Sequence, residues 1–219
     1  MANQTDRHAA LRTRLIDVAE RTIAEKGLAA LRARDLAQQA GCAIGTIYNV
    51  FEHLDELVLC VGARTLAMLD KVLRAARSSS RHGSPEEAVA ELVRLALAYL
   101  EFAARHEVRW RALLEHRMSE ARPLPDWFVE QQHLLFAQVE VPLETLLPEL
   151  DRDARHILAR TLFSAVHGIV ALGLEEKLVS LPLPELRHQL AAAIRAMTAG
   201  RAEFRSIDRV DEPADPGLG

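Results

Sequence analysis

The sequence has few of the residues that mark several common protein classes. It contains two cysteines, Cys42 and Cys60, without CxxC spacing, so neither a zinc site nor a disulfide framework is expected. We expect two small, partly buried thiols in a reducing compartment. No uninterrupted apolar run approaches the roughly 20 residues that span a bilayer. The N-terminal MANQTDRHAA lacks the apolar stretch of a signal peptide. The sequence therefore predicts a cytoplasmic protein with no membrane partner.

Signatures of catalysis and metal binding are missing as well. There is no phosphate-cradling glycine loop, no paired histidine spacing for a metal and no nucleophile elbow. The nine histidines are scattered along the chain. We accordingly predict no catalytic residues, no metal ligands and no cofactor.

An excess of positive charge is also lacking. The net charge is -4 and the pI is about 6.1, which does not by itself suggest a nucleic-acid partner. Residues 1–51 differ from the rest, because they hold seven arginines and lysines against five acidic residues, a net charge of +2 (7 − 5). The local sign suits DNA, although the magnitude is small.

Helical periodicity dominates the chain. Hydrophobic residues make up 49% and charged residues 26%, which is typical of a soluble globular protein. Strand-like alternation is not seen, so the predicted fold is all-α. Pro142 is expected to kink or break the helix that begins near Asp126. The expected helices cover about 11–26, 33–40, 44–51, 54–77, 85–105, 108–119, 126–141, 152–178 and 184–204.

The first three helices are short, and Gly41 lies in a tight connection between the second and the third. This order matches a helix-turn-helix motif, although helix–glycine–helix connections also occur in ordinary bundles. Arg32 stands where the second helix begins, so that helix is expected to start without a side-chain cap.

The helices near the C-terminus carry little charge. Between Leu162 and Leu174 only Ser164 and His167 are polar, and a helix that is apolar all round is buried on more than one side. The last helix contains the segment LAAAIRAM, whose alanines permit close approach. These features predict a homodimer through the helices at about 151–178 and 184–204. A central helix in a monomeric bundle would give the same pattern.

Two segments carry a family resemblance. The stretch LIDVAERTIAEKGLAALRARDLAQQAGCAIGTIYNVFEHLDEL resembles the N-terminal domain of TetR family transcriptional regulators, most specifically in Gly45, Thr46, Ile47, Tyr48 and Phe51. Downstream, LFSAVHGIVALGLEEKL is similar to the C-terminal class named for a Trp-His-Gly triplet. There His167 and Gly168 fit the triplet, and Val166 replaces the tryptophan.

The resemblance implies a DNA-binding helix-turn-helix domain over 1–55, a ligand-binding and dimerisation domain over 56–205, and a tail over 206–219 that we expect to be disordered. It implies a ligand-responsive regulator, most simply a repressor that a small-molecule effector releases from a palindromic double-stranded DNA operator. Two positions depart from the family pattern, because Ile44 and Leu54 stand where family members often have lysine. An all-α ligand carrier or enzyme whose N-terminal helices do not bind DNA is the alternative.

The third helix supplies most of the predicted DNA contacts. At 100° per residue, Ile44, Ile47 and Phe51 should face the core, and the polar residues should face outward. Hydroxyl groups of Thr46 and Tyr48 can donate to phosphates. Asn49 can pair with adenine or contact a phosphate, and Ala43 and Ile44 can touch a thymine methyl group. With two predicted phosphate contacts from the second helix, the set is Arg32, Arg34, Ala43, Ile44, Gly45, Thr46, Tyr48 and Asn49. Without the resemblance, the same residues fit an ordinary amphipathic helix.

A ligand pocket is predicted from aromatic and polar residues farther along the chain. In WRALLEHRM, the side chains of Trp110, Leu113, Leu114 and Arg117 are expected to share one helix face. Arg117 fits either an internal salt bridge with a glutamate or a contact to a ligand carboxylate or phosphate. The candidate pocket residues are Trp110, Leu114, Arg117, Trp127, Phe136, Phe163 and His167. The alternative is that the aromatics are plain core and His167 is a satisfied structural histidine.

Overall fold

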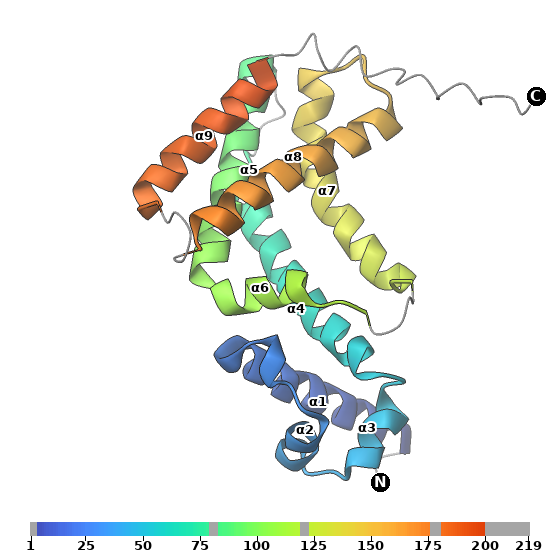
Figure 1. Cartoon of the computed structure of the whole chain (residues 1–219). Helices are drawn as coiled ribbons and strands as arrows, with labels where there is room; N and C mark the ends of the chain where they lie inside the picture. The colour runs from blue at the N-terminus through green and yellow to red at the C-terminus, as the bar shows by residue number, and fades with distance from the viewer. Residues whose placement is uncertain (1–3, 79–82, 119–122, 176–180, 200–219) are drawn as a thin grey trace, which may run out of the picture. The chain divides into compact units, whose positions relative to one another are not determined.

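The structure is a computed structural model that describes residues 4–78, 83–118, 123–175 and 181–199 (Figure 1). Within these ranges the chain forms helices and no strand, which confirms the predicted all-α fold. The elements are α1 (Gln4–Lys26), the 3-10 turn η1 (Leu28–Ala30), α2 (Ala33–Ala40), α3 (Ile44–Val50), α4 (Leu54–Ala76), α5 (Pro85–Arg105), α6 (Glu107–Glu115), α7 (Asp126–Leu146), α8 (Arg152–Gly173) and α9 (Leu183–Ala199).

The chain divides into two compact units. The first comprises Met1–Ala75 and Glu101–Leu135, and the second comprises Ala76–Leu100 and Phe136–Gly219. The first unit therefore contains α1–α4 and α6, the second contains α8 and α9, and residues of α5 and α7 contribute to both.

In the first unit, the head formed by α1–α3 packs around the apolar face of α1. Leu15, Val18, Ala19 and Ile23 recur at helical spacing and are almost fully buried. Helix α2 adds Leu36, Ala37 and Ala40 to the same cluster, and the α3 region adds Ile47 and Phe51. Burying one large apolar side chain contributes about 1.5 to 3 kcal/mol, so this shared cluster is what holds the short helices α2 and α3 against α1.

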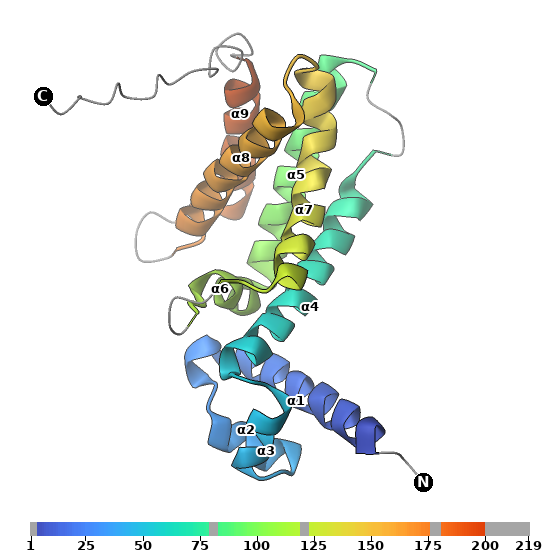
Figure 2. The same cartoon turned by 90° about the vertical axis from the view of Figure 1, so that its right-hand side faces the viewer.

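In the second unit, α8 and α9 lie side by side (Figure 2). Asp151 caps α8 as its sequence suggests, because its carboxylate accepts a hydrogen bond from the Ala154 N–H at 2.8 Å. Helix α9 buries Leu186, Leu190 and Ile194. At Gly173, an added Cβ would lie 2.5 Å from Cδ1 of Leu186, so the absence of a side chain lets the two helices approach closely.

Four predicted helix boundaries need correction. Helix α1 begins at Gln4, earlier than the expected start near 11. Pro142 does not end its helix, because α7 continues to Leu146. The helix expected over 108–119 ends at Glu115, since His116 has extended backbone angles (φ -64°, ψ 125°). Helix α8 ends at Gly173. The expected continuation toward 178 is wrong at Leu174 and Glu175, which are described and are not helical. Residues 176–178, the end of the last helix near 204 and the tail over 206–219 lie outside the described residues.

One described helix, Arg152–Gly173, is long and apolar enough to cross a membrane by length and composition. Core helices of soluble proteins meet the same two criteria. A third of its most apolar window is buried in the protein, so part of its apolar surface faces outward.

Candidate DNA-binding site

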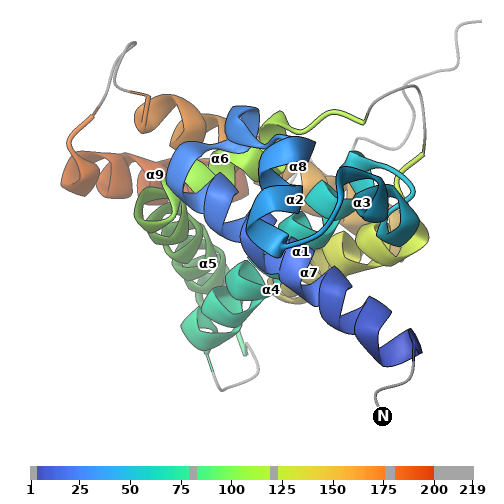
Figure 3. The ribbon, with the colours of Figure 1, turned by 90° about the horizontal axis from the view of Figure 1, so that it is seen from below.

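A short connection joins α2 to α3 (Figure 3). It contains a left-handed turn at Gly41. Gly41 has φ 66° and ψ 41°, a conformation that residues with a Cβ rarely adopt. Its N–H and that of Cys42 donate to the carbonyls of Gln38 and Ala37 at 3.2 and 2.9 Å, which closes the end of α2. No atom lies within 4 Å of a Cβ built on Gly41, so the backbone conformation, and not crowding, favours glycine here.

Helix α3 is held by two apolar anchors. Ile47 and Phe51 are both fully buried in the head. The residues predicted to face away from the core, Gly45, Thr46 and Asn49 with Tyr48 at the flank, are exposed or half-buried. Ala43, which precedes the helix, is exposed as well. The prediction that Ile44 faces the core is wrong, because its side chain is 45% exposed. Side chains in the first turn of a helix tilt toward its N-terminus, and Ile44 opens this seven-residue helix, so it extends beyond the anchors.

The exposed face of α3 carries no formal charge, and two exposed arginines, Arg32 and Arg34, stand at the start of α2. Arg32 is the N-cap residue of α2 and makes no side-chain cap bond, as predicted. Its guanidinium instead donates to the carbonyl of Ala29 at 2.7 Å, which keeps this cation close to the start of α2.

Side chains of α1 contact the last turn of α3, Phe51 after it and the first turns of α4. Nε2 of His8 lies 3.2 Å from the carbonyl oxygen of Asn49. The Arg12 guanidinium lies 5.0 Å from the ring centroid of Phe51 and donates to Glu56 at 3.3 Å and to Sγ of Cys60 at 3.2 Å. Burial raises the pKa of the Cys60 thiol. Both cysteines are free thiols and partly buried, as predicted.

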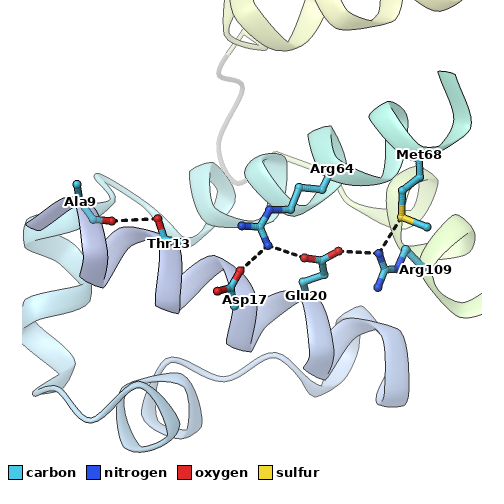
Figure 4. Close-up of polar contacts among 7 residues, drawn as sticks. All are labelled: Ala9, Thr13, Asp17, Glu20, Arg64, Met68 and Arg109. Atoms are coloured by element: carbon cyan, nitrogen blue, oxygen red, sulfur yellow. Dashed lines mark hydrogen bonds and ion pairs between the residues drawn. The ribbon is translucent and has the colours of Figure 1, made fainter. Parts of the chain in front are cut away.

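A second polar cluster joins α1 to α4 and α6 within the first unit (Figure 4). Glu20 accepts hydrogen bonds from Nη1 of Arg64 and Nη1 of Arg109, each at 2.6 Å. Arg64 also donates to Asp17 at 2.6 Å, and Arg109 donates to the sulfur of Met68 at 3.2 Å. Asp17 and Glu20, two of the five acidic residues in 1–51, are therefore paired with arginines from outside that segment. Because these arginines neutralise two negative charges, the head is more positive than the count over 1–51 indicates.

A small cavity lies beside this cluster, also within the first unit. Its volume of about 20 Å³ is enough for one water molecule and far below the volume of a drug-sized ligand site. Burial lowers the pKa of His116 in its wall, and Asp55 partly opposes that shift. The lining consists of Ile23, Val58, Leu59, Val61, Gly62, Thr65, Arg109, Ala112, Leu113, His116 and Phe128.

The structure places four of the predicted pocket residues in the first unit. Trp110 is buried in the core, whereas Leu114, Arg117 and Trp127 are exposed. The prediction that Trp110, Leu114 and Arg117 share one helix face is wrong, because α6 ends at Glu115 and the helical spacing does not reach Arg117. The residues that line the cavity are the immediate sequence neighbours of the three exposed ones. They are Leu113 beside Leu114, His116 beside Arg117 and Phe128 beside Trp127.

The other three predicted pocket residues come together in the second unit. The rings of Phe136 and Phe163 meet edge to face at 5.5 Å, and Phe163 stacks on His167 at 5.9 Å. Tyr99, which the sequence did not single out, contacts Phe163 at 5.5 Å, and its hydroxyl lies 2.9 Å from Nδ1 of His167. Burial lowers the pKa of His167, so the neutral imidazole is favoured at this site.

Comparison with known proteins identifies the family. Residues 15–60 match the model described as bacterial regulatory proteins, tetR family, and residues 92–197 match the tetracyclin repressor-like C-terminal domain. The chain belongs to the TetR family. It is a DNA-binding transcription regulator rather than an enzyme. The finer assignment to the Trp-His-Gly class stays a prediction.

Solved structures share the fold of this TetR family chain at low sequence identity. A TetR regulator from a Rhodococcus species is 18% identical, covers 87% of this chain and 97% of its own, and superposes with a TM-score of 0.56. A TetR family regulator from Streptomyces coelicolor is also 18% identical, covers 94% and 92%, and has a TM-score of 0.59. A protein of unknown function from a Rhodococcus species is 22% identical, covers 90% and 98%, and has a TM-score of 0.65. Identities this low establish the fold alone.

Proposed function

We propose that the protein is a cytoplasmic homodimeric repressor that binds a palindromic operator and leaves it when a small-molecule effector binds. The observation that carries this proposal is the exposed, uncharged face of α3, anchored by Ile47 and Phe51 behind the Gly41 turn of a TetR head. In a two-fold dimer, two copies of α3 would enter successive major grooves about 34–36 Å apart. Residues 1–55 would read DNA, and residues 56–205 would bind the effector and the partner.

The DNA contacts follow from side-chain chemistry on the head. Hydroxyl groups of Thr46 and Tyr48 would donate to phosphates, and the amide of Asn49 would pair with adenine or contact a phosphate. A Cβ at Gly45 would have no neighbour within 4 Å, so its side-chain-free surface suits close approach of DNA. Arg32 and Arg34, exposed at the start of α2, would contact phosphates from the flank.

The dimer interface is proposed on α8 and α9. Along α8, a stripe with helical spacing carries mainly small or apolar side chains, and Ile157 and Leu172 at its two ends are 65% and 60% exposed. Gly168 on the same stripe has open space around its α-carbon. Exposed alanines Ala192 and Ala196 on α9 also permit close packing. An exposed surface of small and apolar side chains fits the interface of a two-fold homodimer, the commonest oligomer.

The effector site is proposed at the ring cluster of the second unit. Tyr99, Phe136, Phe163 and His167 offer apolar ring faces, and the Tyr99 hydroxyl and the His167 imidazole offer polar atoms. Such a combination suits a flat, largely apolar molecule with one hydrogen-bonding group. An effector that favours the free conformation over the DNA-bound one must weaken operator binding by the same factor, typically about 5- to 150-fold.

A mobility-shift experiment tests the proposal. Purified protein is added to labelled duplex DNA from upstream of its own gene, with an unrelated duplex of equal length as the control. A discrete complex that resists unrelated competitor DNA and contains two protein chains is expected. Binding that is equal on both duplexes would favour the alternative, a ligand carrier that keeps only the fold of a regulator.

A further inference from the structure

We propose that Ile44 is a specificity-determining residue, and that its side chain recognises the C5 methyl group of a thymine in each operator half-site. The inference rests on the proposed function, because it requires α3 to enter the major groove. It adds the chemistry of one base contact and the residue that makes it.

The large exposed apolar side chains among the described residues of the head lie on α3. Among residues 6–71, the large apolar side chains that are exposed are Ile44 and Tyr48, at 45% and 50%. They stand four residues apart on α3, so they lie on neighbouring turns of one face. Other large apolar side chains of the head, such as Leu36, Ile47 and Phe51, are buried in its core. Two neighbouring exposed apolar side chains give this face of α3 an apolar surface that a binding partner can cover.

The surroundings of Ile44 decide what it can bind. Its neighbours Ala43 and Gly45 are small and exposed, so its side chain stands out from the helix. No formally charged residue occurs from Gly41 to Phe51, so this part of α3 cannot make the ionic phosphate contact that a lysine would make. On the major-groove floor, the apolar group offered by the bases is the thymine methyl. The cations suited to phosphate, Arg32 and Arg34, lie at the start of α2.

A branched aliphatic side chain cannot hydrogen-bond to guanine, cytosine or adenine edges. Placing Ile44 over those edges would remove water from the polar groups of the bases and would offer no hydrogen bond in return. Placing it against a thymine methyl buries apolar surface on both molecules. Ile44 therefore favours thymine through an apolar contact and disfavours the other three bases through the cost of desolvating them. Specificity arises from the difference between these two free energies.

The experiment uses the full chain and a duplex that wild-type protein selects from a random-sequence library. Each thymine of that duplex is replaced in turn by deoxyuridine, which lacks only the methyl group, and affinity is measured by fluorescence anisotropy. We expect one thymine in each half-site at which the replacement weakens wild-type binding about fourfold. For Ile44→Ala, the same replacement should have no effect, which gives a double-mutant cycle between the side chain and the methyl group.

Leu134→Ala is the matched control, because Leu134 is an exposed aliphatic residue of α7 at 54% exposure, outside the head. It should keep the full sensitivity to deoxyuridine. The inference requires a thymine whose replacement by deoxyuridine weakens binding of the wild type but not of Ile44→Ala. It is overturned if no thymine in the selected duplex behaves in this way. Failure to select any sequence would instead overturn the proposed function itself, so the two failures are distinguishable.

Discussion

Glu20 on α1 and Arg109 on α6 are 89 residues apart in sequence and share a hydrogen bond of 2.6 Å. Both side chains are less than one-fifth exposed, so water screens the pair only weakly. The same glutamate binds Arg64 of α4, and Arg109 also lines the small cavity of the first unit. A movement of α6 would therefore reach Glu20 through Arg109, and a movement of α4 would reach both Glu20 and Asp17 through Arg64.

The first prediction is that Glu20→Gln destabilises the protein by about 1 to 2 kcal/mol, because it leaves two arginines without their shared carboxylate. Urea unfolding followed by circular dichroism measures the change. The control is Asp70→Asn, which removes the partner of Arg74 in a solvent-exposed pair within α4 and should alter the midpoint little. Equal effects of the two substitutions would contradict a special role for the Glu20 cluster.

The second prediction concerns the turn before α3. Gly41→Ala should destabilise the head by about 1 kcal/mol, because the left-handed conformation is costly for any residue with a Cβ. Gly45→Ala is the matched comparison, since Gly45 lies within α3 and its Cβ would meet no neighbour. It should leave the stability of the protein unchanged or slightly raised, because alanine is the better helix former. Thermal unfolding of both variants checks the difference, and loss of stability at Gly45 alone would contradict it.

The third prediction is a fall in stability under mild acid. The pKa values of His106, His116 and His167 are lowered from the ordinary 6.5, mainly by burial, with Arg109 and Arg105 contributing at His106. As the pH falls below about 6.5, these histidines become protonated in the unfolded chain before they do so in the folded chain. Their contribution to the free energy of unfolding is therefore complete above about pH 6.5 and is lost as the pH falls. Urea midpoints at pH 7.5 and 5.5 measure the loss. His167→Asn should make the dependence on pH shallower, and an unchanged dependence would rule out His167 as a contributor.

The fourth prediction addresses the proposed dimer. Leu172→Glu places a charge on the exposed stripe of α8 and should convert the dimer to a monomer that keeps its helical content. Sedimentation velocity gives the mass, and circular dichroism gives the helicity. Leu124→Glu is the control, because Leu124 is also exposed but belongs to the segment before α7. A Leu172→Glu variant that sediments as the wild type would exclude this face of α8 from the interface.

The sequence predicted much of the head. Helical spacing located α2 and the start of α3, and it correctly identified Ile47 and Phe51 as buried. The same rule failed at Ile44, because periodicity describes direction around a helix and cannot show where the neighbouring core ends. It failed again in α6, where the helix stops at Glu115 without a glycine or proline signal.

Long-range polar contacts could not be predicted from the sequence. Arg12, Arg64 and Arg109 each find partners more than 40 residues away, and nothing in the local sequence pairs them. Tyr99 was missed for a similar reason, since its partner His167 lies 68 residues farther along the chain. Local patterns specify helices and faces, whereas these contacts depend on how the helices pack.

The most direct test of the central claim, that this head reads DNA through α3, compares wild type with Tyr48→Ala on the duplex that wild type selects from a random library. Anisotropy titrations at roughly 50 to 200 mM salt give the affinity and its salt dependence. The logarithm of the binding constant falls with the logarithm of the salt concentration with a slope of about -0.9 per phosphate contact. We predict a shallow slope for wild type, and for Tyr48→Ala an affinity at least about tenfold weaker, equivalent to 1.4 kcal/mol, with an unchanged dimer. Equal affinities of wild type and Tyr48→Ala for the selected duplex would contradict the account.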